Sequence, residues 1–227
     1  MTMTEFAEQL DARIAKYDLL CHPFYKAWSA GALMREDLRE YASNYFHHVS
    51  AFPEYLSEFA SRVPEGAMRR AVVATRDEEL GVQGSCSHSE LWLDFVEGMG
   101  GERQVTMTPV AEISELTNAF RSVARTGAPE EALAAFYAYE SQVPRVAAEK
   151  DRGLREMYGA DAKTRGYFTL HTTADIYHSQ VWKRQLLRVV ENNPAAAERA
   201  LLAAESAAKA LWTALDGIEA ARMERAA

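Results

Sequence analysis

The clearest indication of both fold and chemistry is the stretch Tyr167-Phe-Thr-Leu-His171-Thr-Thr-Ala-Asp175-Ile-Tyr-His178. It contains no Pro or Gly, and apolar residues continue beyond it at helical spacing. In one α-helix, His171, Asp175 and His178 would lie within about 60° of one another. Imidazole and carboxylate groups together suit iron, manganese or zinc. The stretch therefore predicts a metal-binding helix face, with a solvated polar face as the alternative.

Helical spacing of apolar residues also dominates the rest of the chain, and no segment alternates like a β-strand. The pattern predicts one all-α bundle of about seven to nine helices in a single domain, residues 1–227. The helices are expected at about 6–17, 24–30, 35–59, 64–80, 88–98, 110–124, 129–154, 167–192 and 195–223.

Composition excludes several classes of protein. Apolar residues make up 48% of the 227 residues, which is typical of a folded globular chain, and the net charge is −8 without a basic stripe. Nucleic acid is therefore not an expected partner. No apolar run is long enough to span a membrane, and the N-terminus does not resemble a signal peptide. Two cysteines are too few for a disulfide framework. A cytoplasmic protein is expected.

Glu140 is the most informative carboxylate, because its helical neighbours are largely aromatic and apolar. A buried carboxylate without a partner is costly, so Glu140 needs a cation or must be neutral. Pro144 cannot donate to the Glu140 carbonyl, which predicts an interruption of the helix there. A salt bridge from Glu140 to Arg145 or Lys150 is the alternative to a metal.

Two further ligand candidates flank the Gly-rich break between residues 81 and 87. Glu78 lies in an acidic run at the end of one predicted helix, and His88 opens the next. Carboxylates and histidines from facing helices build dinuclear iron or manganese sites in bundles. The predicted set is Glu78, His88, Glu140, His171, Asp175 and His178. For the remaining histidines, a structural role is the better expectation.

A series of motifs resembles a known family. The motifs are His22-Pro-Phe-Tyr25-Lys-Ala-Trp28, Leu38-Arg-Glu-Tyr41-Ala, Ala51-Phe-Pro53-Glu-Tyr-Leu, Tyr139-Glu140-Ser-Gln-Val-Pro144-Arg145, Glu149-Lys150-Asp-Arg-Gly-Leu154 and His171-x3-Asp175-x2-His178. In this order they resemble the haem-oxygenase-like dimetal oxidases of the TenA/PqqC superfamily, and within it the 4-aminobenzoate synthases of the chlamydial type.

The resemblance implies that the six predicted residues bind two transition metal ions, Fe/Fe or Mn/Fe. Glu78 is the least certain of them, because it precedes His88 by ten residues where the family pattern has seven. Glu79 and Asp77 are the alternatives. The resemblance also implies a homodimer, and O2 and an external reductant as small-molecule partners.

The resemblance further implies that the enzyme is its own substrate. Tyr25 matches the tyrosine that supplies the aromatic ring, Lys150 matches the suggested amino donor, and Tyr41 matches a second tyrosine near the site. A dimetal oxidase acting on an external amino acid or fatty acid is the alternative. A PqqC-like activity or a non-enzymatic interaction protein is a second alternative, and metal content separates that last role from the others.

Overall fold

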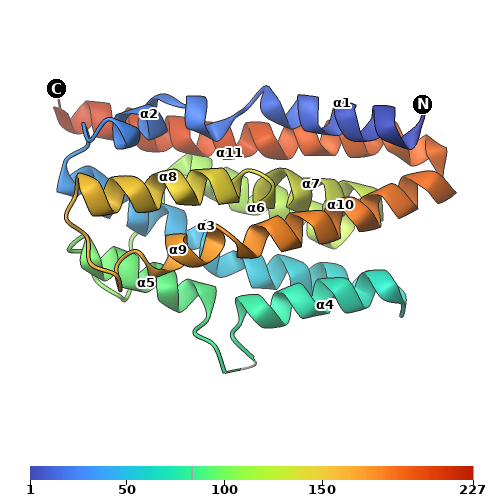
Figure 1. The fold of residues 1–227 in the computed structure, drawn as a ribbon, viewed down its shortest axis with the longest axis horizontal. Helices are drawn as coiled ribbons and strands as arrows, with labels where there is room; N and C mark the ends of the chain where they lie inside the picture. Colours follow the sequence, from blue (N-terminus) through green and yellow to red (C-terminus); the bar gives the residue numbers. More distant parts are fainter. Residues whose placement is uncertain (83, 227) are drawn as a thin grey trace.

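A computed structural model describes residues 1–82 and 84–226, and these residues form a bundle of α-helices without β-strands (Figure 1). The elements are α1 (Met3–Ala15), η1 (Leu19–Cys21), α2 (Pro23–Ser29), α3 (Arg35–Arg62), α4 (Ala67–Glu79), α5 (His88–Gly98), α6 (Ala111–Thr126), α7 (Pro129–Glu140), α8 (Val143–Glu156), α9 (Gly166–His171), α10 (Ala174–Asn192), η2 (Pro194–Ala196) and α11 (Ala197–Ala226). The predicted all-α fold is confirmed.

Helix α7 lies at the centre of the bundle because its sequence is apolar on every side. All eight side chains from residue 132 to residue 139 are Ala, Leu or aromatic, and α7 packs against α6, α10 and α11. A helix that is apolar all round belongs in a core. In Figure 1, α1 and α11 run side by side along one edge, and α4 and α5 lie at the opposite edge.

The chain is divided into more helices than predicted, because two expected helices are interrupted. The predicted helix 129–154 is split at Ser141 and Gln142, close to the interruption expected from Pro144. The predicted helix 167–192 is split at Thr172 and Thr173, although neither Pro nor Gly occurs near these residues. Within the described residues, no helix combines the length and apolarity needed to cross a membrane.

The break after His171 has a local cause. Thr172 Oγ1 donates to the carbonyl of Thr169, and Thr173 Oγ1 donates to the carbonyl of Leu170. Such bonds from side chain to backbone compete with helical hydrogen bonds. The prediction that His171, Asp175 and His178 share one continuous helix is therefore wrong, and His171 is oriented independently of the other two.

Candidate active site

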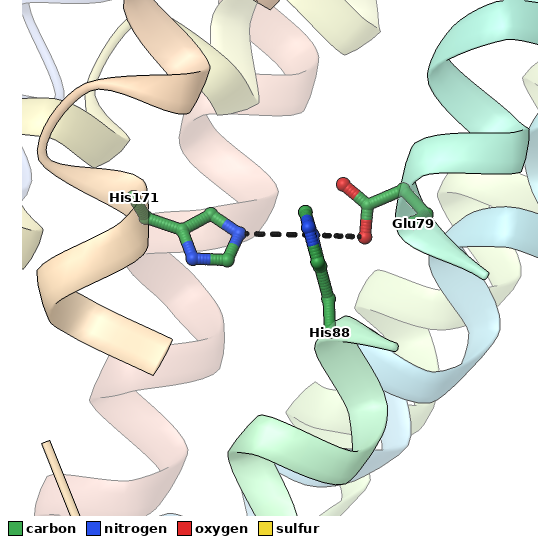
Figure 2. A group of neighbouring side chains, drawn as sticks. All are labelled: Glu79, His88 and His171. Atoms are coloured by element: carbon green, nitrogen blue, oxygen red, sulfur yellow. Dashed lines mark hydrogen bonds and ion pairs between the residues drawn. The ribbon is translucent and has the colours of Figure 1, made fainter. Parts of the chain in front are cut away.

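Three buried side chains from three helices form the first group of potential metal ligands (Figure 2). His88 Nδ1 lies 2.8 Å from Glu79 Oε2 and 3.1 Å from His171 Nε2. His171 Nδ1 donates to the Tyr167 carbonyl at 2.6 Å, so the Nε2 lone pair faces the other two residues. A second nitrogen held by a backbone carbonyl is the usual arrangement of a metal-binding histidine.

A second group shares Glu79 with the first. Potential ligand atoms of Glu79, Glu140 and His178 lie within 4.8 Å of one another, and all three residues are buried. His178 Nδ1 is 3.2 Å from Asp175 Oδ1, and His178 Nε2 is 2.6 Å from Glu78 Oε2. The arrangement offers two adjacent sets of nitrogen and oxygen ligands with one carboxylate between them.

Carboxylates and imidazoles in the two groups lie close enough to shift one another's pKa values. Burial raises the pKa of Glu140 well above its ordinary value, although His178 opposes that shift. Burial alone would lower the pKa of His178, but nearby carboxylates, Asp175 and Glu140 first, raise it to about 10. Burial lowers the pKa of His171. The group thus retains protons that a bound cation would displace.

Four of these residues lie at or next to a helix terminus. Glu79 is the last residue of α4, His88 is the first of α5, Glu140 is the last of α7 and His171 is the last of α9. Each helix therefore delivers one side chain to the cluster and then turns away. We call the set Glu79, His88, Glu140, His171, Asp175 and His178 the histidine–carboxylate cluster.

Five of the six predicted ligands belong to this cluster, whereas Glu78 lies at its edge. The Glu78 side chain is 47% exposed, and its carboxylate contacts His178. Glu79, named above as an alternative, is 6% exposed and belongs to both groups. The alternative salt bridges of Glu140 do not form, because Arg145 pairs with Asp18 and Lys150 contacts tyrosines. Metal binding by the cluster stays a prediction.

The predicted residues Tyr25, Tyr41 and Lys150 meet in a separate buried pocket between α2, α3 and α8. Lys150 Nζ donates to Tyr25 Oη at 2.8 Å and also contacts Tyr41 Oη. The two phenol oxygens are 3.0 Å apart. Lys150 Nζ lies 4.3 Å from the ring centroid of Tyr25 and 4.4 Å from that of Tyr41. The amine is therefore enclosed by aromatic rings.

Burial in this pocket shifts the pKa values of the Lys150 amine and the Tyr25 phenol toward their neutral forms. Burial lowers the pKa of the Lys150 amine well below its ordinary value, and no carboxylate contacts the amine within the described residues. Burial also raises the pKa of the Tyr25 phenol. Burial thus favours the neutral forms of the amine and the phenols in this pocket, and a neutral amine has a lone pair for proton transfer or nucleophilic attack.

Tyr139 and Tyr167 connect the pocket with the cluster. Both side chains line the cavity next to Tyr25 and Lys150, and both line a second cavity next to Glu79 and Glu140. The Tyr167 ring stacks on His171 with centroids 3.9 Å apart. Sequence reasoning did not select these two tyrosines as site residues, although Tyr139 directly precedes Glu140.

Both cavities are small. The volume open to the centre of a water molecule is about 20 Å³ beside Lys150 and about 10 Å³ beside the cluster. A single water needs about 10–15 Å³ of this kind of volume. These spaces therefore accommodate water or a diatomic molecule, but neither accommodates an arene or an acyl chain.

Comparison with known proteins places the chain among redox enzymes. Residues 39–212 match the family described as iron-containing redox enzyme. The chain is 36% identical to a 4-aminobenzoate synthase from Nitrosomonas europaea, over 96% of this chain and 92% of the relative. It is 35% identical to a 4-aminobenzoate synthase from Chlamydia pneumoniae, over 85% and 86% of the two chains.

A solved structure confirms the expected fold type. A domain of unknown function with a haem oxygenase-like fold from Shewanella denitrificans superposes with a TM-score of 0.81. The alignment covers 98% of this chain and 94% of that chain at 14% identity, so it supports the fold alone. The resemblance to haem-oxygenase-like proteins that the motifs predicted is confirmed.

Proposed function

The chain belongs to the family of iron-containing redox enzymes, and we propose that it is a dinuclear metal oxidase that makes 4-aminobenzoate from its own Tyr25. The two relatives named 4-aminobenzoate synthase match most of the chain. Their product carries nitrogen para to a carboxyl carbon, where tyrosine carries oxygen para to Cβ. The conversion therefore needs an amine nitrogen that replaces the departing phenol oxygen and is released from its donor carbon, oxidation of Cβ to a carboxyl carbon by O2, and cleavage of the Cα–Cβ bond.

The contact between Lys150 and Tyr25 is the observation that carries this proposal. A lysine amine without a carboxylate partner lies 2.8 Å from the phenol oxygen of a buried tyrosine. The cavity beside the two residues has room for about one water. An external aromatic substrate has no space there, whereas the aromatic ring of Tyr25 is already in place.

The residues of the pocket have distinct tasks in this proposal. In its neutral form, which burial favours, the Lys150 amine accepts the phenol proton when Tyr25 is oxidised. The same nitrogen lies 4.3 Å from the centroid of the ring that must receive nitrogen. Tyr41 Oη contacts both groups and holds them in register. The surrounding rings exclude bulk water, which protects a reactive intermediate from hydrolysis.

The histidine–carboxylate cluster fits two transition metal ions. Glu140 Oε1 is buried and has no hydrogen-bond partner within the described residues, as expected for an oxygen that a cation would complete. Glu79, His88 and His171 would hold one ion, and Glu79, Glu140 and His178 the other, next to Asp175. When bound, the ions supply the one-electron chemistry that O2 activation requires.

Two compositions of the metal pair are compatible with these ligands. One group has two imidazoles and one carboxylate, and the other has one imidazole and two carboxylates. Iron accepts both kinds of ligand, and manganese prefers the carboxylate-rich kind. Metal analysis of protein from cells supplied with both metals distinguishes an Fe/Fe pair from a Mn/Fe pair.

Oxidation of an external amino acid or fatty acid remains the competing function. It requires a cavity that opens by several side-chain volumes before a substrate enters, because the present spaces hold about one water each. A PqqC-like activity or a non-enzymatic role does not require the buried ligands of the cluster. Metal content therefore separates a PqqC-like activity and a non-enzymatic role from the two oxidase functions, 4-aminobenzoate synthesis and oxidation of an external substrate.

The decisive experiment supplies Fe(II), a reductant and O2 to the purified protein and no aromatic compound. We expect 4-aminobenzoate by liquid chromatography and mass spectrometry, at no more than one molecule per chain. Tyr25→Phe should abolish the product, because the phenol oxygen and its proton are missing. Tyr17→Phe is a matched control, since Tyr17 lines neither cavity.

Two outcomes would contradict the proposal. Product formation that survives Tyr25→Phe would assign the ring to another source. Turnover that begins only after an external amino acid or fatty acid is added would support the competing function instead.

We also propose that the protein forms a homodimer and is located in a reducing compartment. Cys21 and Cys86 are exposed and free, as a reducing compartment would keep them. Sedimentation of the purified protein tests the oligomeric state, and fractionation of the producing cells tests the compartment.

A further inference from the structure

Trp182 is fully buried and contacts one member of the histidine–carboxylate cluster directly. It lies on α10 one turn after His178, and its indole N–H donates to Glu140 Oε2. The indole also packs against Phe136, one turn before Glu140 on α7. A buried tryptophan usually finds a hydrogen-bond partner for its N–H. Here the partner is a carboxylate of the cluster, so Trp182 both fills the core and orients Glu140.

The two oxygens of Glu140 consequently have different environments. Oε2 is held by Trp182, whereas Oε1 lies 3.9 Å from His178 Nδ1 and has no hydrogen-bond partner within the described residues. An indole can donate a hydrogen bond but cannot accept one or bind a cation. Trp182 therefore engages Oε2 as a hydrogen-bond donor and leaves Oε1 for a ligand.

The need for such a restraint follows from the position of Glu140. It is the last residue of α7, and the chain turns at Ser141 and Gln142 before α8 begins. The following turn therefore does not fix the direction of the Glu140 side chain. Trp182 supplies this restraint from α10, the helix that also carries His178, so two of the three ligands of the second group, Glu140 and His178, are positioned by α10.

We propose that Trp182 is a positioning residue that restricts Glu140 to binding a metal ion through Oε1 alone, and so sets the affinity of the ion held by Glu79, Glu140 and His178. This inference rests on the proposed dinuclear centre. The ion held by Glu79, His88 and His171 does not depend on Glu140, so the effect of Trp182 is confined to one of the two ions.

The test is an anaerobic titration of metal-free protein with Mn(II), Fe(II) or Co(II), followed by calorimetry and metal analysis. Trp182→Phe removes the N–H donor and keeps an aromatic ring. Replacement of Trp182 by benzothienylalanine keeps the bicyclic shape and exchanges N–H for sulfur, so it isolates the hydrogen bond if the Phe variant packs poorly. Trp212→Phe is the matched control, because Trp212 packs on His22 instead.

We expect one ion to bind to both Trp182 variants as it does to the wild-type protein, and the other to bind about 10–100-fold more weakly. The visible spectrum of the second Co(II) ion should change as well, because a carboxylate free to bind through both oxygens alters the coordination number. A residue that only fills the core would change neither the affinity of one ion selectively nor this spectrum.

Unchanged affinity and spectrum in the benzothienylalanine protein would overturn the inference, and so would equal weakening of both ions. Failure of the wild-type protein to bind two ions would instead refute the proposed dinuclear centre and this inference with it. The two kinds of failure are therefore distinguishable.

Discussion

The histidine–carboxylate cluster and the Tyr25–Lys150 pocket are both buried and polar, but only the cluster combines groups of opposite charge. In the cluster, carboxylates of Glu79 and Asp175 contact imidazoles. In the pocket, the Lys150 amine contacts two phenols and lies over aromatic rings, and no carboxylate among the described residues pairs with it. The two regions share Tyr139 and Tyr167 as common walls.

This difference separates two ways of making a buried group reactive. In the cluster, acids and imidazoles share protons with one another. A bound cation can take the place of these protons. An amine without an anion loses its own proton instead, because burial disfavours the charged form. The first region is thus suited to binding metal ions, and the second to holding a nucleophilic nitrogen.

The largest effect is expected from Glu79 in the cluster, and its neighbour Glu78 supplies the matched control. Glu79→Gln removes the carboxylate that both groups share, and we expect the affinity for both ions to fall by more than about 100-fold. Glu78→Gln changes an adjacent, half-exposed carboxylate at the edge and should leave two ions bound. Metal analysis after dialysis measures both, and the reverse ranking would make Glu78 the shared ligand.

Loss of the buried amine in the pocket should stabilise the fold while it abolishes the reaction. Lys150→Met replaces an unpaired buried amine by an apolar side chain of similar length. We expect the free energy of unfolding at pH 7 to rise by about 1–4 kcal/mol, while 4-aminobenzoate formation is lost. Denaturant unfolding and the product assay measure the two effects.

The pH dependence of the same variant gives an independent check. The pKa of Lys150 is lower in the folded than in the unfolded protein, so the unfolded chain binds more protons below pH 10. Between the folded-state pKa of Lys150 and about pH 10, the wild-type protein should gain up to about 1.4 kcal/mol per pH unit relative to Lys150→Met. Parallel curves for the two proteins would mean that Lys150 stays charged.

The smallest effect concerns the residue that starts the helix of Tyr25. His22 Nδ1 accepts a hydrogen bond from the Phe24 N–H at the start of α2, and its Nε2 contacts Asp216. His22→Leu removes this cap and should cost about 1 kcal/mol of stability and part of the product yield. His22→Asn keeps a capping acceptor and should retain more of both.

Acid should remove the same cap. Burial lowers the pKa of His22 although Asp216 opposes the shift, so the neutral, capping form is favoured in the folded protein. Stability is therefore full above pH about 6.5 and falls as the pH decreases toward the folded-state pKa. An acid limb that is equally steep in the wild-type protein and in His22→Asn would exclude this role.

Much of the fold could be predicted because apolar spacing is a local property of the sequence. Helix α5 begins at His88 and ends at Gly98, as expected from the surrounding glycine-rich breaks. The interruption before Pro144 was also visible, since proline removes a backbone donor. The break after His171 was not, because it depends on hydroxyl groups of Thr172 and Thr173 that usually allow a helix to continue.

The site was predicted less completely, because its composition depends on which side chains meet in space. Motif resemblance selected Tyr25, Lys150 and most of the cluster, but among three adjacent acids it placed Glu78 ahead of Glu79 and Asp77. The difference in burial between Glu78 and Glu79 follows from the arrangement of α4 against α3 and α10. The role of Trp182 was hidden for the same reason, since it requires α10 to lie against α7.

The most direct test of the self-substrate mechanism is mass spectrometry of protein grown with ring-labelled tyrosine and then exposed to Fe(II), a reductant and O2 without free tyrosine. The account predicts labelled 4-aminobenzoate and a matching loss of the ring and Cβ at position 25. Unlabelled product, or labelled product with Tyr25 intact in every chain, would contradict it.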